Sequence, residues 1–343
     1  MRSLRHLTLC LCALVMVLPT FGQALHPDPA GVRPSGISTP PADAQTYPKA
    51  KRVSRAADDE EKAPKAKRAR PTSEEDTPVP KKRSRSKTAQ FTSEPPRTTG
   101  GVPNTGAKAV MMIDARTGQI LYEKNADEAR AAASTQKLLT ALIVAERGNL
   151  EQSVTVEQVD TLAEPVKLNI KPGDTYQRID LLRALLVKSP NDVARCLARD
   201  QAGSIDAFAA IMNRRASELG ATHSHFVNPN GLPIPGQYST ARDLSLIARA
   251  AYATPTIRSI VCLPQLVFRF ANGRTRELEN TNKVLKQFPY CNGMKTGYTE
   301  AAGHCLIASG ARPGRDIIVV VLGDSKGGVW RDATALLNWG LWL

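Results

Sequence analysis

The stretch that decides both the fold and the chemistry is Ala131-Ala-Ala-Ser134-Thr-Gln-Lys137-Leu-Leu-Thr-Ala-Leu-Ile-Val-Ala-Glu146. Its apolar residues recur at helical spacing, which predicts a helix that begins near Ser134. A spacing of three places Ser134 and Lys137 one turn apart on the same face. A serine hydroxyl needs a neighbouring base to act as a nucleophile, and lysine can be that base when burial and a nearby cation lower its pKa. Taken alone, the pattern is more typical of an ordinary solvated Ser/Lys pair than of a nucleophile and its base.

Strand patterns lie on both sides of this stretch, and helical patterns fill the middle of the chain. Strands at both ends and helices between them predict one sheet built from the two ends of the domain, with an inserted helical lobe. The sequence predicts strands at 109–113, 119–122, 294–298, 305–309 and 317–322, a hairpin within 264–285, and helices at 179–188, 190–201, 204–219, 240–252 and 330–342.

Two further short motifs carry groups suited to catalysis. Ser189-Pro190-Asn191 lies at a predicted helix–helix junction, where the hydroxyl could relay a proton, although Ser before Pro is also a common helix cap. Lys295-Thr296-Gly297 lies on a predicted strand. There Lys295 offers a cation, Thr296 a hydroxyl, and the glycine a close approach of backbone and substrate. A plain turn at a strand end is the alternative.

The first 24 residues have the pattern of an export signal, with a positive start, an uncharged apolar segment and small residues before Ala24. The apolar segment is short for a membrane span. We therefore expect cleavage near Ala24, with retention as an anchor as the alternative. Residues 25–104 follow as a basic linker rich in Pro, Lys, Arg and Ser, too poor in large apolar residues to fold. Residues 105–343 remain for a catalytic domain.

The chain is basic, with 46 Lys and Arg against 32 Asp and Glu and a net charge of +14. An exported basic protein is attracted to anionic cell-wall polymers or to an anionic membrane surface, and the linker is the candidate segment for such contact. The basic runs at 65–70 and 81–87 contain no aromatic residue for base stacking. We therefore expect no nucleic-acid partner.

Four cysteines follow the signal, and an oxidising compartment permits them to form disulfides. No pair has the CxxC spacing of a zinc site, so neither a metal nor another cofactor is predicted. The sequence alone does not choose among the three complete pairings. A disulfide between Cys291 and Cys305 is one open alternative, because these residues lie on strands expected to be adjacent. The four are Cys196, Cys262, Cys291 and Cys305.

The order of the three motifs gives them a specificity that none has alone. SxxK, SxN and KTG follow one another in the chain, as they do in class A β-lactamases and penicillin-binding proteins. Several flanking stretches resemble the branch of serine-type D-alanyl-D-alanine carboxypeptidases, which are low-molecular-mass penicillin-binding proteins. These stretches are 208–213, 216–220, 225–232, 238–244, 280–282 and 293–299.

The resemblance covers about 107–343 and implies a β-lactamase/transpeptidase-like α/β (α+β) fold. That fold has an antiparallel five-stranded sheet flanked by helices and an inserted all-helical lobe. The resemblance also implies that Ser134 is acylated, that Lys137 takes its proton, that Ser189 passes a proton to the leaving D-alanine, and that Asn191 orients Lys137.

The resemblance further implies how the substrate is held. Lys295 and Thr296 would bind its terminal carboxylate beside Gly297, and the backbone N–H groups of Ser134 and Tyr298 would form the oxyanion hole. Arg242 is a further candidate for a substrate carboxylate, with a structural ion pair as the equal alternative.

The implied substrates are peptidoglycan stem peptides, and β-lactams are the implied inhibitors. A DD-endopeptidase shares every motif. A serine β-lactamase usually needs a glutamate for deacylation, and the stretch after Asn228 offers only Asn230 and Gln237. A non-catalytic cell-wall-binding protein is disfavoured because the motif residues are intact. The sequence departs from typical relatives at Ala132-Ala133 and Pro190. It also stops where such relatives continue into a second domain and a membrane helix, which puts membrane attachment in doubt.

Overall fold

The computed structural model describes residues 101–343. The expected signal at 1–24 and all but the last residues of the expected linker lie outside the described residues. No helix among the residues that the structure describes is long and apolar enough to cross a membrane.

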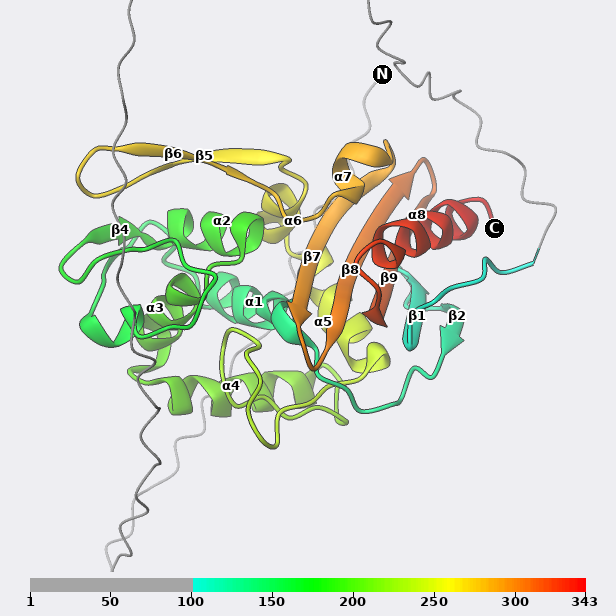
Figure 1. Cartoon of the computed structure of the whole chain (residues 1–343), viewed down its shortest axis with the longest axis horizontal. Coiled ribbons are helices and arrows are strands. Elements are labelled where there is room, and N and C mark those ends of the chain that lie inside the picture. Colours follow the sequence, from blue (N-terminus) through cyan, green and yellow to red (C-terminus); the bar gives the residue numbers. More distant parts are fainter. Residues whose placement is uncertain (1–100) are drawn as a thin grey trace, which may run out of the picture. The chain divides into compact units, whose positions relative to one another are not determined.

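A five-stranded antiparallel sheet forms the frame of the molecule, in the order β2-β1-β9-β8-β7 (Figure 1). β1 comes from the start of the domain and β9 from its end, yet they pair along their length, from Ala109 opposite Leu322 to Asp114 opposite Ile317. The two ends of the domain therefore build one sheet, as predicted. The strands are β1 (Ala109–Asp114), β2 (Ile120–Lys124), β7 (Cys291–Thr299), β8 (Gly303–Arg312) and β9 (Arg315–Asp324).

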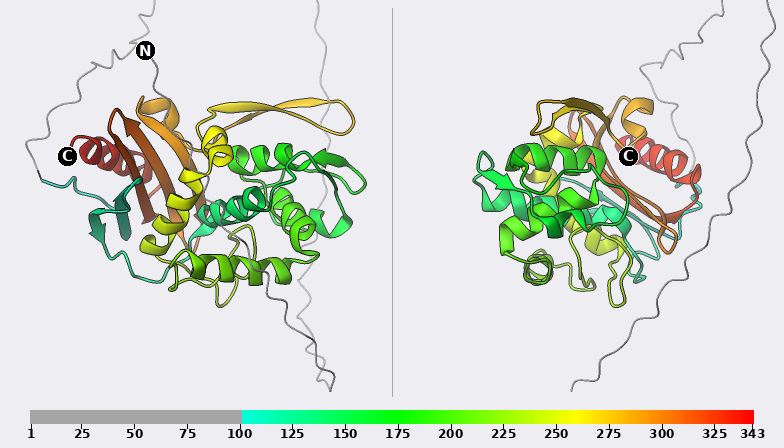
Figure 2. Two further views of the ribbon diagram at one scale, coloured as in Figure 1. Left: turned by 180° about the vertical axis from the view of Figure 1, so that it is seen from behind. Right: turned by 60° about the vertical axis from the view of Figure 1, so that its left-hand side comes forward.

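Helices cover both faces of this sheet (Figure 2). α8 (Gly328–Leu341) packs on one face against β8 and β9, and α5 (Ala241–Ala253) packs on the other against β1 and β9. Alternate residues of β9 point to the two apolar clusters, with Val319 in one and Val320 in the other. Because both faces are buried, the strand reads as a continuous apolar run.

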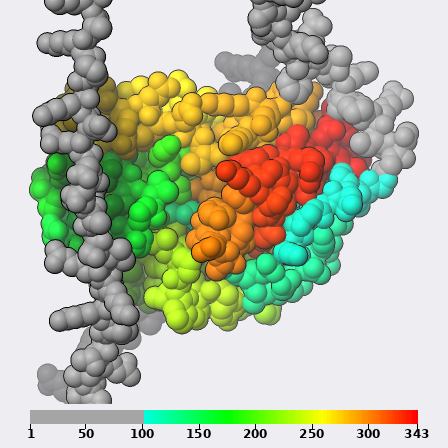
Figure 3. Space-filling view, in the orientation of Figure 1, coloured from blue at the N-terminus to red at the C-terminus, as the bar shows by residue number. Residues whose placement is uncertain are grey.

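A lobe inserted between β2 and β7 contains most of the helices. In Figure 3 its green surface meets the orange strands β7 and β8. The lobe is not all-helical, because it also holds two small two-stranded antiparallel ribbons, the second of which is the hairpin predicted within 264–285. The ribbons pair β3 (Ser153–Thr155) with β4 (Thr175–Gln177) and β5 (Gln265–Arg269) with β6 (Thr275–Glu279). The helices are α1 (Lys137–Arg147), α2 (Arg178–Lys188), α3 (Asn191–Ala202), α4 (Ile205–Glu218), α6 (Pro255–Val261) and α7 (Val284–Gln287), with 3-10 turns η1 (Ala133–Gln136) and η2 (Gln158–Thr161).

Local sequence sets several of these boundaries. The side chains of Ser204 and Thr240 accept hydrogen bonds from the backbone at the starts of α4 and α5. Gly203 ends α3 with a positive φ of 78°. The predicted helix at Ser134 begins instead with the 3-10 turn η1, and α1 proper begins at Lys137. The nucleophile candidate thus lies just before the regular helix, on a tighter turn.

Candidate active site

Ser134 is held on η1 by close backbone approaches from two glycines. A Cβ added at Gly297 of β7 would lie 2.8 Å from Ser134 N, and one at Gly231 would lie 2.0 Å from Ala133 O. Gly231 also has a φ of +84°, and Ala133 has a φ of 48°. Only glycine fits either approach. The turn that presents Ser134 is therefore set by two segments far from it in sequence.

Lys137 is fully buried, and its Nζ contacts three oxygen atoms. Ser134 Oγ lies at 2.8 Å, Asn191 Oδ1 at 2.7 Å and the backbone oxygen of Asn230 at 2.7 Å. Burial, together with the charge of Lys295, holds the pKa of Lys137 well below its usual value, against an opposing effect from Asp192. A neutral amine at this position can accept the serine proton.

The second motif lies between α2 and α3. Ser189 has left-handed backbone geometry with a φ of 66°, and its Oγ is buried with no hydrogen-bond partner among the described residues. The amide of Asn191 donates to the backbone oxygens of Glu164 and Pro165. These two bonds orient the amide so that its oxygen faces Lys137. The motif therefore supplies one free hydroxyl and one fixed acceptor.

The third motif lies on β7, at the edge of the sheet. Lys295 is fully buried, its Nζ donates to the backbone oxygen of Thr296 at 2.9 Å, and burial lowers its pKa to about 7. The Thr296 hydroxyl donates to Thr281 Oγ1 at 2.7 Å. A buried cation and a pair of hydroxyls thus lie beside the nucleophile's turn.

These motifs border a groove of about 360 Å³. The sequence assigned a catalytic or substrate-binding role to five of its lining residues and to none of the other seven, although Thr281 lies in a stretch that resembles the family and Cys305 was considered for a disulfide. The named residues are Ser134, Ser189, Thr296, Gly297 and Tyr298, and the others are Val166, Lys188, Thr281, His304, Cys305, Val329 and Trp330. Asn230 was also missed as a contact of the lysine, since it acts through a backbone carbonyl that any residue possesses.

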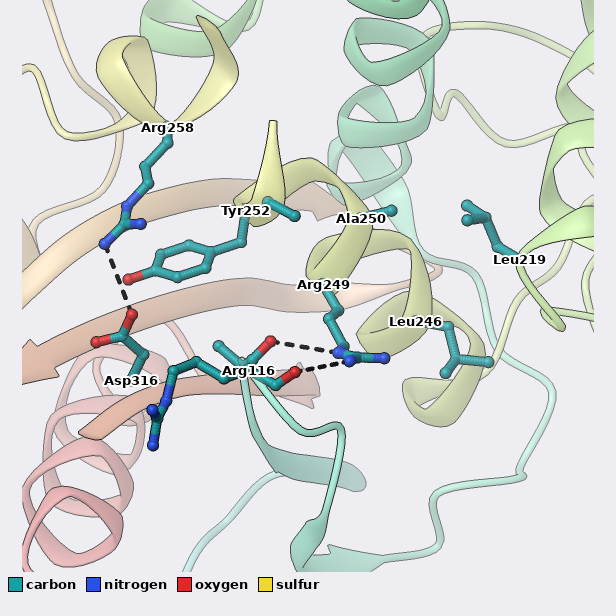
Figure 4. Close-up of a pocket in the computed structure, with 10 residues that line it drawn as sticks. Arg116, Leu219, Leu246, Arg249, Ala250, Tyr252, Arg258 and Asp316 are labelled. Atoms are coloured by element: carbon teal, nitrogen blue, oxygen red, sulfur yellow. Dashed lines mark hydrogen bonds and ion pairs between the residues drawn. The ribbon is translucent and has the colours of Figure 1, made fainter. Parts of the chain in front are cut away.

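A second cavity of about 400 Å³ lies at the C-terminal half of α5 (Figure 4). Its charged groups engage one another or the backbone. Arg258 lies 3.6 Å from Asp316, and Arg249 donates to the backbone oxygens of Ala115 and Arg116. It contains no nucleophile next to a base, so the chemistry belongs to the groove at Ser134.

Two sequence expectations need correction. Arg242 forms ion pairs with Asp127 and Glu123 and is not among the residues lining the groove, so the ion-pair interpretation is the one the structure favours. The prediction of a Cys291–Cys305 disulfide is wrong, because neither thiol is bonded to another cysteine within residues 101–343. Their strands are adjacent as expected, but Cys291 lies opposite Gly310 while Cys305 lies opposite Gly297. This offset along the strands keeps the two sulfurs apart.

A family model described as D-alanyl-D-alanine carboxypeptidase matches residues 95–326, more than half of the chain. The chain belongs to this family. Membership in the carboxypeptidase family makes it a serine peptidase, and the five-stranded sheet with its helical lobe is the fold of its structural neighbours.

The relatives most similar in sequence include two named D-alanyl-D-alanine carboxypeptidases. The D-alanyl-D-alanine carboxypeptidase DacB2 of Mycobacterium tuberculosis is 36% identical over 245 residues, which cover 70% of this chain and 84% of the relative. DacF of Bacillus subtilis is 32% identical, over 64% of this chain and 58% of its own length. The chain thus spans less than two thirds of some relatives.

Solved structures of similar fold include a carboxypeptidase and a transpeptidase. The crystal structure of a D-alanyl-D-alanine carboxypeptidase from M. tuberculosis H37Rv has 35% identity and a TM-score of 0.68, and the match covers 72% of this chain and 96% of that one. The Streptomyces K15 DD-transpeptidase has 29% identity and the same TM-score, and the match covers 71% of this chain and all of that one.

Proposed function

We propose that the chain removes the terminal D-alanine from peptidoglycan stem pentapeptides through an acyl-enzyme on Ser134. The observation that carries the proposal is the 2.8 Å contact between Ser134 Oγ and Lys137 Nζ at the edge of the groove. A buried lysine with a lowered pKa is a suitable base for a serine nucleophile.

Acylation proceeds by attack of Ser134 Oγ on the carbonyl carbon between the last two D-alanines. The serine proton moves to Lys137 Nζ as the C–O bond forms. The C–N bond then breaks, and the departing amine takes a proton from the hydroxyl of Ser189, which Lys137 reprotonates. The absence of a partner for Ser189 Oγ among the described residues supports this role, because a hydroxyl without an internal bond is free to donate to the leaving group.

Binding of the substrate uses the third motif. Lys295 and the Thr296 hydroxyl hold the terminal carboxylate, and the backbone N–H groups of Ser134 and Tyr298 stabilise the oxyanion. The close packing of Gly297 on Ser134 N supports this arrangement, because it brings the strand and the nucleophile's turn together. Water then hydrolyses the ester and frees Ser134. A β-lactam enters the same path and is retained as a slow ester.

The place of action follows from the same proposal. Peptidoglycan lies outside the cytoplasmic membrane, so we infer export with cleavage of the signal near Ala24 and a periplasmic or cell-wall location. The basic segment at 25–104 would contact anionic cell-wall polymer or an anionic membrane surface. Deleting 26–104 and measuring sedimentation with cell walls tests this contact, and unchanged binding would exclude it.

The proposed activity is tested with the full exported chain, a fluorescent penicillin and a pentapeptide that ends in D-Ala-D-Ala. We expect covalent label on the unsubstituted chain, release of D-alanine, and loss of both in Ser134→Ala. Arg242→Gln serves as the matched control, because Arg242 is engaged in ion pairs outside the groove. An unlabelled wild-type chain would sink the acyl-serine assignment.

An endopeptidase is the second candidate, because a D-alanyl-D-alanine endopeptidase of Escherichia coli is 31% identical over 71% of this chain and 79% of its own length. The same assay with a cross-linked dimeric stem peptide separates the two. Cleavage of the cross-link without release of terminal D-alanine favours the endopeptidase.

A further inference from the structure

The segment at 227–232 approaches the base although it belongs to no helix or strand. Its contribution is the backbone oxygen of Asn230, which lies 2.7 Å from Lys137 Nζ. The backbone groups of a loop without regular backbone pairing are satisfied by side chains or by water. The position of this oxygen therefore depends on the side chains that hold the loop.

Two glutamine side chains bind the backbone of this loop. Gln237 Oε1 accepts from the backbone N–H groups of Val227 and Asn228 at 3.0 and 3.1 Å, and its Nε2 donates to the oxygen of Leu232 at 2.9 Å. The loop is thereby tied at both of its ends to one side chain.

Gln136 connects this clamp to the nucleophile's turn. It is buried, it lies directly before Lys137, and its Nε2 donates to the oxygen of Asn228 at 2.6 Å. The same nitrogen lies 3.4 Å from Gln237 Oε1. The amides of Gln136 and Gln237 thus meet at Asn228, the residue whose side chain also accepts from the N–H of Gly231 at 2.8 Å.

The position of the Asn230 oxygen matters because of the hydrogen bonds available to a neutral lysine. A neutral amine has two N–H bonds and one lone pair. The oxygens of Asn191 and Asn230 only accept, so they take the two N–H bonds. The lone pair of Lys137 is then left for the hydroxyl of Ser134, whose oxygen lies closer to Lys137 Nζ, at 2.8 Å, than to the Asn230 oxygen, at 3.3 Å. If the Asn230 oxygen moves, an N–H bond can turn toward the serine, and the lone pair no longer faces the proton that it must take.

We propose that Gln136 and Gln237 are positioning residues, which together clamp the loop at 227–232 so that the Asn230 oxygen aims the lone pair of Lys137 at Ser134. This inference rests on the proposed function. It assigns a role in the reaction to two side chains that do not touch the reacting atoms.

The test uses the full chain with Gln136→Met, Gln237→Met and the double variant, which keep side-chain length and remove the amides. The matched control is Asn213→Leu, because Asn213 forms two hydrogen bonds with the backbone of Phe226, the residue just before the loop at 227–232. Acylation by fluorescent penicillin is followed from pH 5 to 9, and end-point labelling counts the competent molecules. Thermal unfolding reports the stability of each variant.

We expect each single variant to acylate at least ~10-fold more slowly, because misplacing a reacting group by about 1 Å can cost ~100-fold. The double variant should lose little more than a single one, since both glutamines act through one oxygen. Asn213→Leu should stay within about 2-fold of wild type once corrected for competent molecules, because its bonds end at Phe226.

The pH profile supplies a readout that a structural role alone would not move. Loss of a well-placed acceptor disfavours the ammonium form, so the acidic limb should shift to lower pH while the maximal rate falls. Two charged groups act on Lys137, namely Lys295 and Asp192, and both are unchanged in every variant.

Wild-type acylation rates in folded single variants would overturn the clamp. So would a double variant whose loss equals the product of the single losses, or a control that slows as much as they do. An unlabelled wild-type chain would instead overturn the proposed function.

Discussion

Lys137 and Lys295 are both completely buried, and the charge on Lys295 helps to depress the pKa of Lys137. Their tasks require opposite protonation states, because Lys137 must be neutral to accept a proton and Lys295 must be charged to bind a carboxylate. Burial lowers the pKa of Lys295 to about 7, and burial together with the charge of Lys295 holds the pKa of Lys137 well below its usual value. The charge of Lys295 thus favours the neutral form of Lys137, which is the form that can act as a base.

This relationship predicts a bell-shaped dependence of kcat/KM on pH, which reports groups of the free enzyme. Activity should rise with pH as Lys137 loses its proton, at a pH far below the usual lysine range. It should fall as pH rises through about 7, where Lys295 loses its charge. Release of D-alanine measured from pH 5 to 10 checks both limbs. A substrate with an amidated C-terminus should lack the alkaline limb, and an alkaline limb near the ordinary lysine pKa would contradict the assignment.

The sequence predicted the fold well where residue patterns were long. The apolar run at 317–322 lies within β9, and the predicted helices at 179–188 and 240–252 match α2 and α5 to within a residue or two. β3 and β4 were missed because each is only three residues long, and such a strand has too few residues to show a period of two.

The site could be predicted only where it depends on side-chain identity. Ser134, Lys137 and Asn191 were found by spacing, and the structure brings them into hydrogen-bond contact. The carbonyl of Asn230 was not predicted, because every residue has a backbone carbonyl and the residue type does not indicate which one contacts the lysine. Arg242 was a misleading candidate for a related reason. The sequence does not distinguish an arginine that binds a substrate carboxylate from one that forms an ion pair with an acidic side chain of the same protein.

Gly231 predicts a test of the backbone contact that shapes the nucleophile's turn. Gly231→Ala would place a Cβ 2.0 Å from the oxygen of Ala133, next to Ser134, and should lower acylation at least ~10-fold. Gly273→Ala is the matched control, because Gly273 has a similar φ of +81° but no atom of the described residues within 4 Å of its added Cβ. Both variants carry the same backbone strain. Equal acylation rates in the two variants would show that the contact does not matter.

Ser189→Ala separates catalysis from stability. Because Ser189 Oγ is buried without a partner among the described residues, its removal should leave the free energy of unfolding within about 0.5 kcal/mol of wild type. Release of D-alanine should fall by about 10²–10⁴-fold, the usual contribution of a proton-transfer group. Asn191→Ala should lower both quantities, because it also removes bonds to the backbone of Glu164 and Pro165. Denaturant unfolding and initial rates measure the two effects, and a large loss of stability in Ser189→Ala would contradict a free hydroxyl.

Asp324 predicts a pH-dependent stability that is independent of the reaction. Its Oδ2 is buried without a partner among the described residues, and burial together with the nearby charge of Asp332 raises its pKa. Asp332 accepts hydrogen bonds from the Thr105 hydroxyl and the Gly106 N–H, which stabilise its ionised form. The unfavourable free energy of burying two neighbouring carboxylates therefore falls on Asp324. A carboxyl with a raised pKa binds its proton more tightly in the folded state, so folding stability declines as pH rises from the unfolded pKa through the folded one.

Asp324→Asn should therefore raise the thermal midpoint at pH 7 by about 2–4 °C, the shift that ~1 kcal/mol produces in a domain of this size. The gain should shrink toward zero near pH 4, where the wild-type carboxyl regains its proton. Asp180→Asn is the control, because Asp180 is exposed and its ion-pair partner among the described residues is the equally exposed Arg183, and it should show neither effect. Scanning calorimetry at several pH values measures the difference. A lower midpoint for Asp324→Asn at pH 7 would mean that the ionised carboxylate stabilises the fold through a partner such as a bound water or cation, since the protein supplies its Oδ2 with no donor among residues 101–343.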